Sequence, residues 1–132
     1  MEKYETLLNM LMDFNKSIRF AAISDKKGEI LWHSQREGVK NIVPYEETKQ
    51  TLLRVIHAWE DNHKIMDDVG SGLYSITSYE KIKRISIPLD DENTLFISIN
   101  NDLPSKTKTK SYGHVADMGK ILSIVDFVKS KK

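Results

Sequence analysis

Several kinds of residue and pattern are missing from this sequence, and each absence excludes a class of protein. There is no cysteine, so disulfide bonds, thiolate metal sites and thiol-dependent enzymes are excluded. No stretch approaches the roughly 20 apolar residues that a membrane-spanning helix needs. The first ten residues, MEKYETLLNM, carry an early acidic residue and no long apolar run, so we expect no signal peptide. These absences predict a soluble, cytoplasmic protein with no membrane partner.

The chain as a whole also lacks an excess of charge of either sign. The 20 Lys and Arg residues nearly balance the 19 Asp and Glu residues, and the formal net charge is +1. The balance does not favour a nucleic-acid partner. Residues 101–132 are more basic, with seven Lys against three Asp. We expect a flexible basic loop at 101–110 and a basic tail at 129–132.

The segment PSKTKTKS within this basic region alternates lysine with hydroxyl residues. Such a pattern could hold phosphates or be a target of modification. It contains no aromatic residue, which single-stranded nucleic-acid sites use for base stacking. A mobile, solvated loop is therefore the favoured interpretation.

Hydrophobic periodicity divides the chain into three helices and five strands, which fit one domain over residues 1–132. The first helix is predicted at 3–17, where apolar residues recur at helical spacing, and a second runs from Pro44 to about Met66. The predicted strands are 18–24, 29–35, 72–79, 82–89 and 94–100. The last helix, at about 112–129, is apolar over a broad surface, which predicts contacts with the sheet and with another helix.

This order, α-β-β-α-β-β-β-α, predicts an α+β fold with one five-stranded antiparallel sheet and helices covering its faces. The stretch Asp25-Lys26-Lys27-Gly28 joins the first two strands. Asp can accept bonds from nearby backbone N–H groups, and Gly allows a positive φ, so a plain hairpin turn explains every residue. It has too few oxygen ligands for calcium and too few glycines for a phosphate loop.

No catalytic motif survives comparison with a structural explanation, so we expect no enzyme, cofactor or metal. His57, Glu60 and Asp61 share one helix face and could contribute to a metal site, but a third ligand would have to come from elsewhere. The solvated helix face with a weak ion pair is favoured instead. Trp32 and Trp59 could line a pocket or anchor a partner, but core packing is the simpler interpretation.

The order and spacing of these elements resemble the roadblock/dynein-light-chain family over nearly the whole chain. The matching segments are YETLLNMLMDF, FAAISDKKGEILWHS, PYEETKQTLLRVIHAW, LYSITSY with IKRISIPL and TLFISI, and HVADMGKILSIVDFV. Longin, profilin and PAS domains have related five-stranded architectures. The chain is also similar to small archaeal proteins built on this theme.

The resemblance implies a non-enzymatic interaction module. Roadblock domains typically form homodimers through the third strand and the central helix, and act as platforms for small GTPases and signalling complexes. Carried over to this sequence, the interface would include Leu73, Tyr74, Ser75, Ile76, Thr77, Tyr79, Leu52, Ile56 and Trp59. The alternative is a sensor of the PAS or profilin kind, with a small molecule held between the sheet and the central helix.

Overall fold

The computed structural model describes residues 2–38, 45–61, 63–101 and 116–130. The helices are α1 (Glu2–Phe14), α2 (Tyr45–Asp61), α3 (His63–Val69) and α4 (Ala116–Lys129). The strands are β1 (Ile18–Ser24), β2 (Ile30–Gln35), β3 (Ser75–Ser78), β4 (Ile82–Pro88) and β5 (Thr94–Asn100). The predicted α+β class and the predicted order of strands are confirmed.

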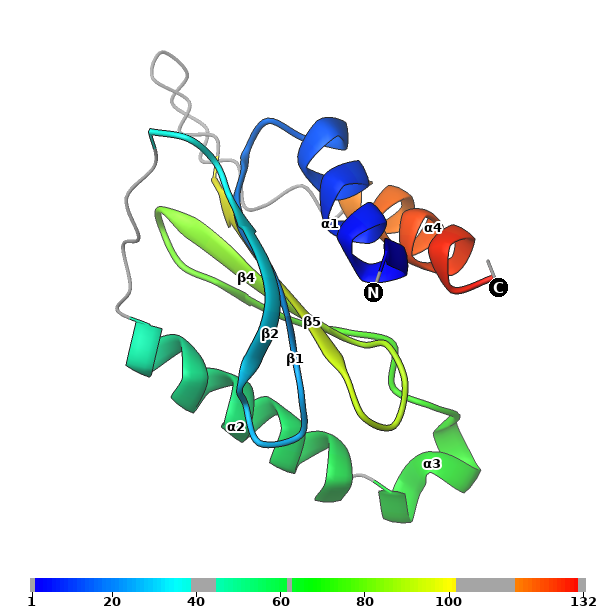
Figure 1. The fold of residues 1–132 in the computed structure, drawn as a ribbon. Helices are drawn as coiled ribbons and strands as arrows, with labels where there is room; N and C mark the ends of the chain where they lie inside the picture. Colours follow the sequence, from blue (N-terminus) through cyan, green and yellow to red (C-terminus); the bar gives the residue numbers. More distant parts are fainter. Residues whose placement is uncertain (1, 39–44, 62, 102–115, 131–132) are drawn as a thin grey trace, which may run out of the picture.

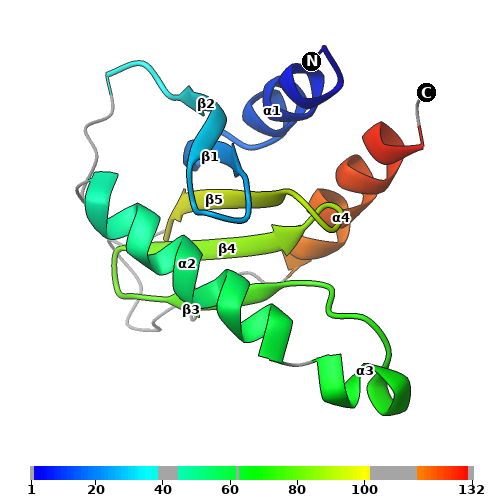
Figure 2. The same cartoon turned by 60° about the horizontal axis from the view of Figure 1, so that its bottom comes forward.

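The five strands form one antiparallel sheet in the order β2-β1-β5-β4-β3 (Figure 1; all five are labelled in Figure 2). Pairing of β1 with β5 joins the first hairpin to the later three-strand meander. One row across the sheet runs from Ala21 through Ile97 and Ile85 to Ile76, which are successive partners in the register. Strands β2 and β3 are the two edges.

Helices α1 and α4 lie side by side on one face of the sheet (Figure 1). The predicted stripe of α1 is buried, with Tyr4, Leu7, Leu8 and Leu11 between 0% and 8% exposed. Residues of α4 such as Ile121 and Val125 belong to the same cluster, which also takes in the inward residues of the strands. The predicted double contact of the last helix, with the sheet and with another helix, is confirmed.

Helix α2 crosses the opposite face of the sheet (Figure 2). Leu52 and Ile56 are buried, and Phe96 is buried on the sheet face that α2 covers. Arg84 reaches α2 from β4, donating to the hydroxyls of Thr48 at 3.2 Å and Thr51 at 3.1 Å. Apolar burial and these hydrogen bonds hold α2 on the sheet.

The turn between β1 and β2 is the predicted hairpin turn. Oδ1 of Asp25 accepts the N–H groups of Lys27 at 2.8 Å and Glu29 at 3.0 Å, and Gly28 has a φ of +80°. The turn also packs on α2, because Gly28 is buried and a Cβ there would lie 3.0 Å from Cγ of Leu53. Glu29 forms an ion pair with Lys49 of α2. The contact with α2 explains why this turn is fixed in place.

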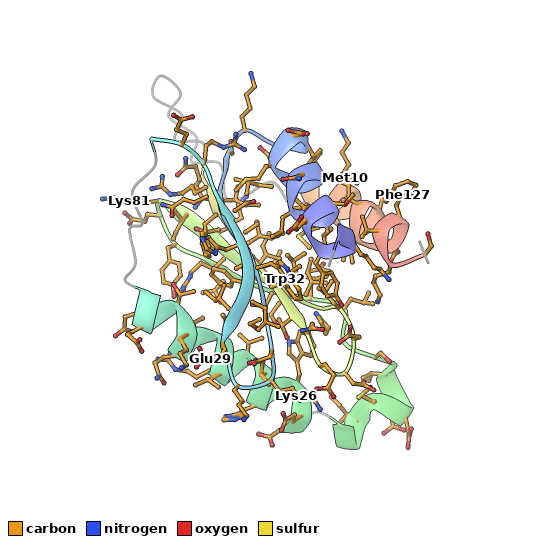
Figure 3. The ribbon with its side chains drawn as sticks, viewed as in Figure 1. Met10, Lys26, Glu29, Trp32, Lys81 and Phe127 are labelled. Carbon is orange, nitrogen blue, oxygen red and sulfur yellow. The ribbon has the colours of Figure 1, made fainter. Side chains whose placement is uncertain are left out.

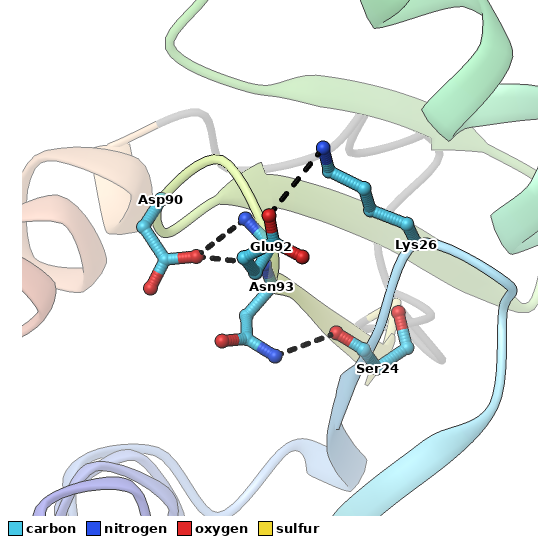
Figure 4. Close-up of polar contacts among 5 residues, drawn as sticks. All are labelled: Ser24, Lys26, Asp90, Glu92 and Asn93. Carbon is cyan, nitrogen blue, oxygen red and sulfur yellow. Dashed lines mark hydrogen bonds and ion pairs between the residues drawn. The ribbon is translucent and has the colours of Figure 1, made fainter.

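A second polar cluster joins the turn after β4 to the rest of the protein (Figure 4). Oδ1 of Asp90 accepts the N–H groups of Glu92 and Asn93, while Nδ2 of Asn93 donates to the carbonyl of Ser24 at 3.3 Å. Lys26 and Glu92 lie 3.6 Å apart as an exposed ion pair. Two hairpin turns at the same end of the sheet are thereby held together.

The hydroxyl of Tyr4 connects α1 to this cluster by donating to Oδ2 of Asp90 at 2.9 Å. Burial raises the pKa of Tyr4 to about 12, and the bond to the Asp90 carboxylate acts in the same direction. Burial by itself would raise the pKa of Asp90, but the hydrogen bonds from Glu92, Tyr4 and Asn93 lower it below its ordinary value. The neutral phenol and the ionised carboxylate are thus the favoured pair.

Three predicted elements differ clearly in their bounds. The helix expected at 3–17 ends earlier, at Phe14. The helix expected from Pro44 to Met66 is divided into α2, which ends at Asp61, and the seven-residue α3. The strand expected at 72–79 is shorter, with only Ser75–Ser78 in the ladder. Gly70, with a φ of +85°, donates its N–H to the carbonyl of Met66 at 2.8 Å and ends α3 as a C-terminal cap. The predicted loop at 101–110 lies almost wholly outside the described residues, and so do the last two residues of the basic tail.

Candidate protein-interaction surface

Within the described part of the chain, the edge strand β3 leaves one side of its backbone open. The N–H of Tyr79 donates to the carbonyl of Ile82 at 2.8 Å, and the register from Ser75 to Ser78 continues this pairing without a shift. Since bonded pairs alternate along an antiparallel ladder, Thr77 and Ser75 also direct their backbone groups toward β4. Ile76 and Ser78 therefore direct their N–H and C=O groups outward, where a further strand can bind.

Large apolar side chains are exposed in the segments that precede and follow this strand in the sequence. Leu73 is 66% exposed, Tyr74 36% and Tyr79 54%, while Ile65 and Val69 on α3 are 49% and 71% exposed. We call these five residues the α3–β3 strip. They form most of the large exposed hydrophobic side chains in the described part of the chain, and the others are Leu31 and Phe127. Such a concentration is typical of an interaction surface.

Helix α3 adds to this surface because it projects from the end of α2, away from the sheet (Figure 2). Ile65 and Val69 are four residues apart and so share one helix face. A helix of seven residues has little stability of its own, since helix nucleation is costly. Burial of this face by a partner would stabilise both the helix and the complex.

The structure narrows the set of residues expected at an interface. Ser75, Ile76 and Thr77 lie on the open edge, and Leu73, Tyr74 and Tyr79 flank it. Leu52 and Ile56 are instead 0% and 5% exposed, on the side of α2 that faces the sheet. They pack in the interior and do not form part of the exposed surface. The predicted interface stays a prediction, and its exposed part is the segment from Leu73 to Tyr79.

Trp59 occupies an intermediate position, partly buried at the end of α2. Its ring lies so close to Gly72 that a Cβ there would be 2.0 Å from Cζ3 of the indole. Gly72 therefore makes room for the ring of Trp59. This contact holds the segment that leads into β3 against α2.

Beneath the open edge, Arg84 provides a buried positive charge next to β3. It is 8% exposed, pairs in register with Thr77, and its guanidinium carbon lies 5.0 Å from the ring centre of Phe96. Its guanidinium contacts the hydroxyls of Thr48 and Thr51 and this ring, so within the described part of the chain the charge is held by neutral groups. Arg84 fixes α2 over the strands that carry the open edge.

Other candidate residues do not converge on a site. His57, Glu60 and Asp61 are exposed on α2, and among residues 2–38, 45–61, 63–101 and 116–130 no three such side chains are placed to hold a metal. Trp32 (labelled in Figure 3) packs edge-on against Tyr4, with 5.2 Å between the ring centres, which is a packing role. None of the described helices is long and apolar enough to cross a membrane.

Two features of the surface were not predicted from the sequence. The sequence predicted one long helix up to Met66, so the separate helix α3 and its exposed face were not predicted. The signal in the sequence was the four-residue spacing of Ile65, Val69 and Leu73. The second open edge, β2, exposes Leu31 at 46%. That edge mixes Leu31 with the polar His33 and Gln35 and is less apolar than the segment around β3.

The arrangement of α1, α2, α4 and the five strands is the fold of roadblock/LC7 domains. The gliding protein MglB from Thermus thermophilus superposes with a TM-score of 0.64 at 14% identity, over 99% of this chain and 91% of that one. A roadblock/LC7 domain from Streptomyces avermitilis gives 0.60 at 8% identity, over 93% and 92% of the two chains. A structure described as MglB with a tetrameric arrangement gives 0.57 at 16% identity, over 96% and 92%.

At these identities the likeness is one of fold. No protein-family model matches the sequence, and no curated protein matches it. The predicted roadblock-like architecture is confirmed by the structures that superpose on it.

Proposed function

We propose that this chain is a non-enzymatic regulatory or scaffold module that works as a homodimer and binds a protein partner, such as a small GTPase or a signalling complex. The observation that carries the proposal is the open edge of β3, which lies beside the α3–β3 strip. The segment Leu73–Tyr79 contains neither a charged residue nor a proline that would oppose strand pairing.

Two further observations support an assembly of this kind. A solved structure with the same fold is described as a tetrameric arrangement of MglB, so the fold is found in assemblies. The resemblance of the sequence to roadblock domains implies homodimerisation and a platform for small GTPases. The edge strand supplies main-chain hydrogen bonds, and the flanking Leu73, Tyr74 and Tyr79 supply apolar area for the same contact.

The proposal is tested by the mass in solution of the wild type and of proline variants on the open edge. Ser78→Pro removes an N–H that points outward, so the bonds between β3 and β4 remain while pairing with a second copy loses a donor. We expect a wild-type dimer by light scattering and a dissociation constant at least tenfold weaker for Ser78→Pro. Ile76→Pro should act in the same way.

Ser78→Ala is the matched control, because it keeps the N–H and should dimerise like the wild type. A circular dichroism spectrum like that of the wild type establishes that the proline variants are folded. A wild-type monomer at all concentrations, or a folded Ser78→Pro variant that dimerises like the wild type, would contradict the proposed interface.

A further inference from the structure

We propose that Arg84 and the hydroxyl groups around it bind a small oxyanion, such as inorganic phosphate or a small carboxylate, between α2 and the sheet. The proposal starts from a buried positive charge. Arg84 is 8% exposed, and within the described part of the chain no carboxylate contacts its guanidinium. Buried charges in proteins are ordinarily paired with an opposite charge. An anion from solution would supply the missing pair.

The guanidinium keeps hydrogen-bond donors for such an ion. Of its five N–H groups, one on Nη1 donates to Thr51 and one on Nη2 donates to Thr48, which leaves three without an acceptor among the described residues. Arginine binds carboxylate and phosphate through two parallel N–H groups. The contacts that hold α2 on the sheet therefore leave enough donors for an oxyanion.

Hydroxyl groups stand on the strands on both sides of Arg84. Thr77 on β3 and Ser98 on β5 are its register partners, so the three side chains lie on the same face of the sheet. Directly opposite residues are about 5 Å apart at Cβ. The hydroxyls of Thr77 and Ser98 have no hydrogen-bond partner in the part of the chain that the structure describes. They can therefore donate to an ion that binds the guanidinium.

Arg36 shows what a purely structural arginine looks like in this fold. It donates to three backbone carbonyls, which accept hydrogen bonds and cannot donate them. The acceptors of Arg84 are side-chain hydroxyls, which can also donate to an anion. Ser86 and Thr94 are buried on the same face as Arg84, whereas the cluster beneath α1 and α4 is wholly apolar. The polar face is the one suited to an ion.

Burial favours a small ion over the side chain of a large partner. Helix α2 covers Arg84, and Thr77 beside it is exposed on the edge strand (Figure 2). An acidic side chain of another protein would have to displace α2 to reach the guanidinium, whereas a small ion can approach beside Thr77. Away from bulk water the attraction between the two charges is also stronger.

Thermal unfolding of the full chain tests the proposal. Inorganic phosphate and acetate are titrated separately, with sodium chloride adjusted to keep the ionic strength constant. A bound ion raises the stability of the folded state, so we expect a saturable rise in the melting temperature of the wild type with at least one of the two. The ion that acts shows whether the site prefers a phosphate or a carboxylate.

Two variants assign the effect to Arg84. Arg84→Met removes the charge and the donors but keeps a long side chain, and the saturable rise should disappear. Arg54→Met is the matched control, because Arg54 is an exposed arginine of α2, and it should respond like the wild type. A folded Arg84→Met that responds like the wild type would overturn the proposal, and so would a wild type that neither ion stabilises.

A third variant covers the case in which Arg84→Met does not fold. Thr77→Val removes one hydroxyl at an exposed position, and the dissociation constant of the ion should rise by about threefold to tenfold, as expected for one lost hydrogen bond. Ser78→Ala, on the opposite face of β3, is its control and should bind like the wild type. Equal affinity of Thr77→Val and Ser78→Ala would contradict the proposed site.

The signal of the Arg84 Nε–H in a nuclear magnetic resonance titration reports binding at the guanidinium itself. It should shift with the same dissociation constant that the melting curves give. A signal that stays constant while the melting temperature rises would overturn the proposal, because the ion would then bind elsewhere. These measurements follow the ion and not the mass in solution, so they stand apart from the test of the homodimer.

Discussion

At Gly72 the lack of a side chain lets the ring of Trp59 lie directly against the backbone. The contact fixes the segment between α3 and β3, although Gly72 itself is exposed. A single methyl group would overlap the indole, so the ring or the segment would have to move. This residue shows how a local contact controls the position of the edge strand.

Gly72→Ala should destabilise the protein by about 1–3 kcal/mol, measured as the free energy of unfolding in urea. Gly119→Ala is the matched control, because Gly119 lies in α4 with nothing within 4 Å of the added Cβ. There alanine should stabilise the helix by about 0.5–1 kcal/mol. Equal stabilities for Gly72→Ala and the wild type would show that Trp59 is not held by this contact.

At the scale of elements, side chains join segments that are distant in the sequence. The guanidinium of Arg36 donates to the carbonyls of Met12 at 2.8 Å and Asn15 at 3.1 Å, at the end of α1, and to that of Ile18 at 2.8 Å in β1. The carbonyl of Met12 lies in the last turn of α1, where carbonyls lack helical partners, and the charged donor satisfies it. Arg36 thus fixes the corner between α1 and the sheet.

The hydroxyl of Tyr4 makes a similar connection between α1 and the turn after β4. Tyr4→Phe should cost about 1–2 kcal/mol near neutral pH, because a hydrogen bond to a carboxylate is lost. The folded pKa of about 12 is above the ordinary value of 10, so the stabilisation is complete below pH 10 and is lost as the pH rises toward 12.

The stability difference between the wild type and Tyr4→Phe should therefore shrink by about 1 kcal/mol between pH 9 and pH 11. Urea unfolding of the wild type and of Tyr4→Phe at both pH values measures it. A difference that stays constant over this range would contradict the role of the Tyr4 hydroxyl. Asp90 contributes at the acid end, where its stabilising effect is lost as the pH falls through its lowered pKa.

The elements themselves could be predicted because their signals are local. The spacing of apolar residues predicted α1 and the five strands, and Asp25 with Gly28 predicted the first turn. The division between α2 and α3 was missed, since apolar residues continue at helical spacing to Ile65. The contacts of Arg36 and Gly72 join segments that are separated in the sequence. They depend on how those segments face each other in the fold, so the spacing of residues along the chain does not reveal them.

The sequence predicted where the interaction surface around β3 lies, but not which backbone groups and side chains of the segment are exposed. The sequence marked Leu73–Tyr79 as a strand without charge or proline. Which backbone groups point outward depends on the pairing of β3 with β4, and the burial of Leu52 and Ile56 depends on how α2 crosses the sheet. Both are properties of the folded chain.

For the molecule as a whole, the central claim is that the outward backbone groups of β3 bind a second copy. Amide hydrogen exchange at Ile76 and Ser78 tests this most directly, because these N–H groups have no strand partner among the residues that the structure describes. We expect slow exchange at concentrations where the dimer forms, and exchange that accelerates as the protein is diluted. Fast exchange at both amides at every concentration, while Ser75 and Thr77 remain protected, would contradict the account.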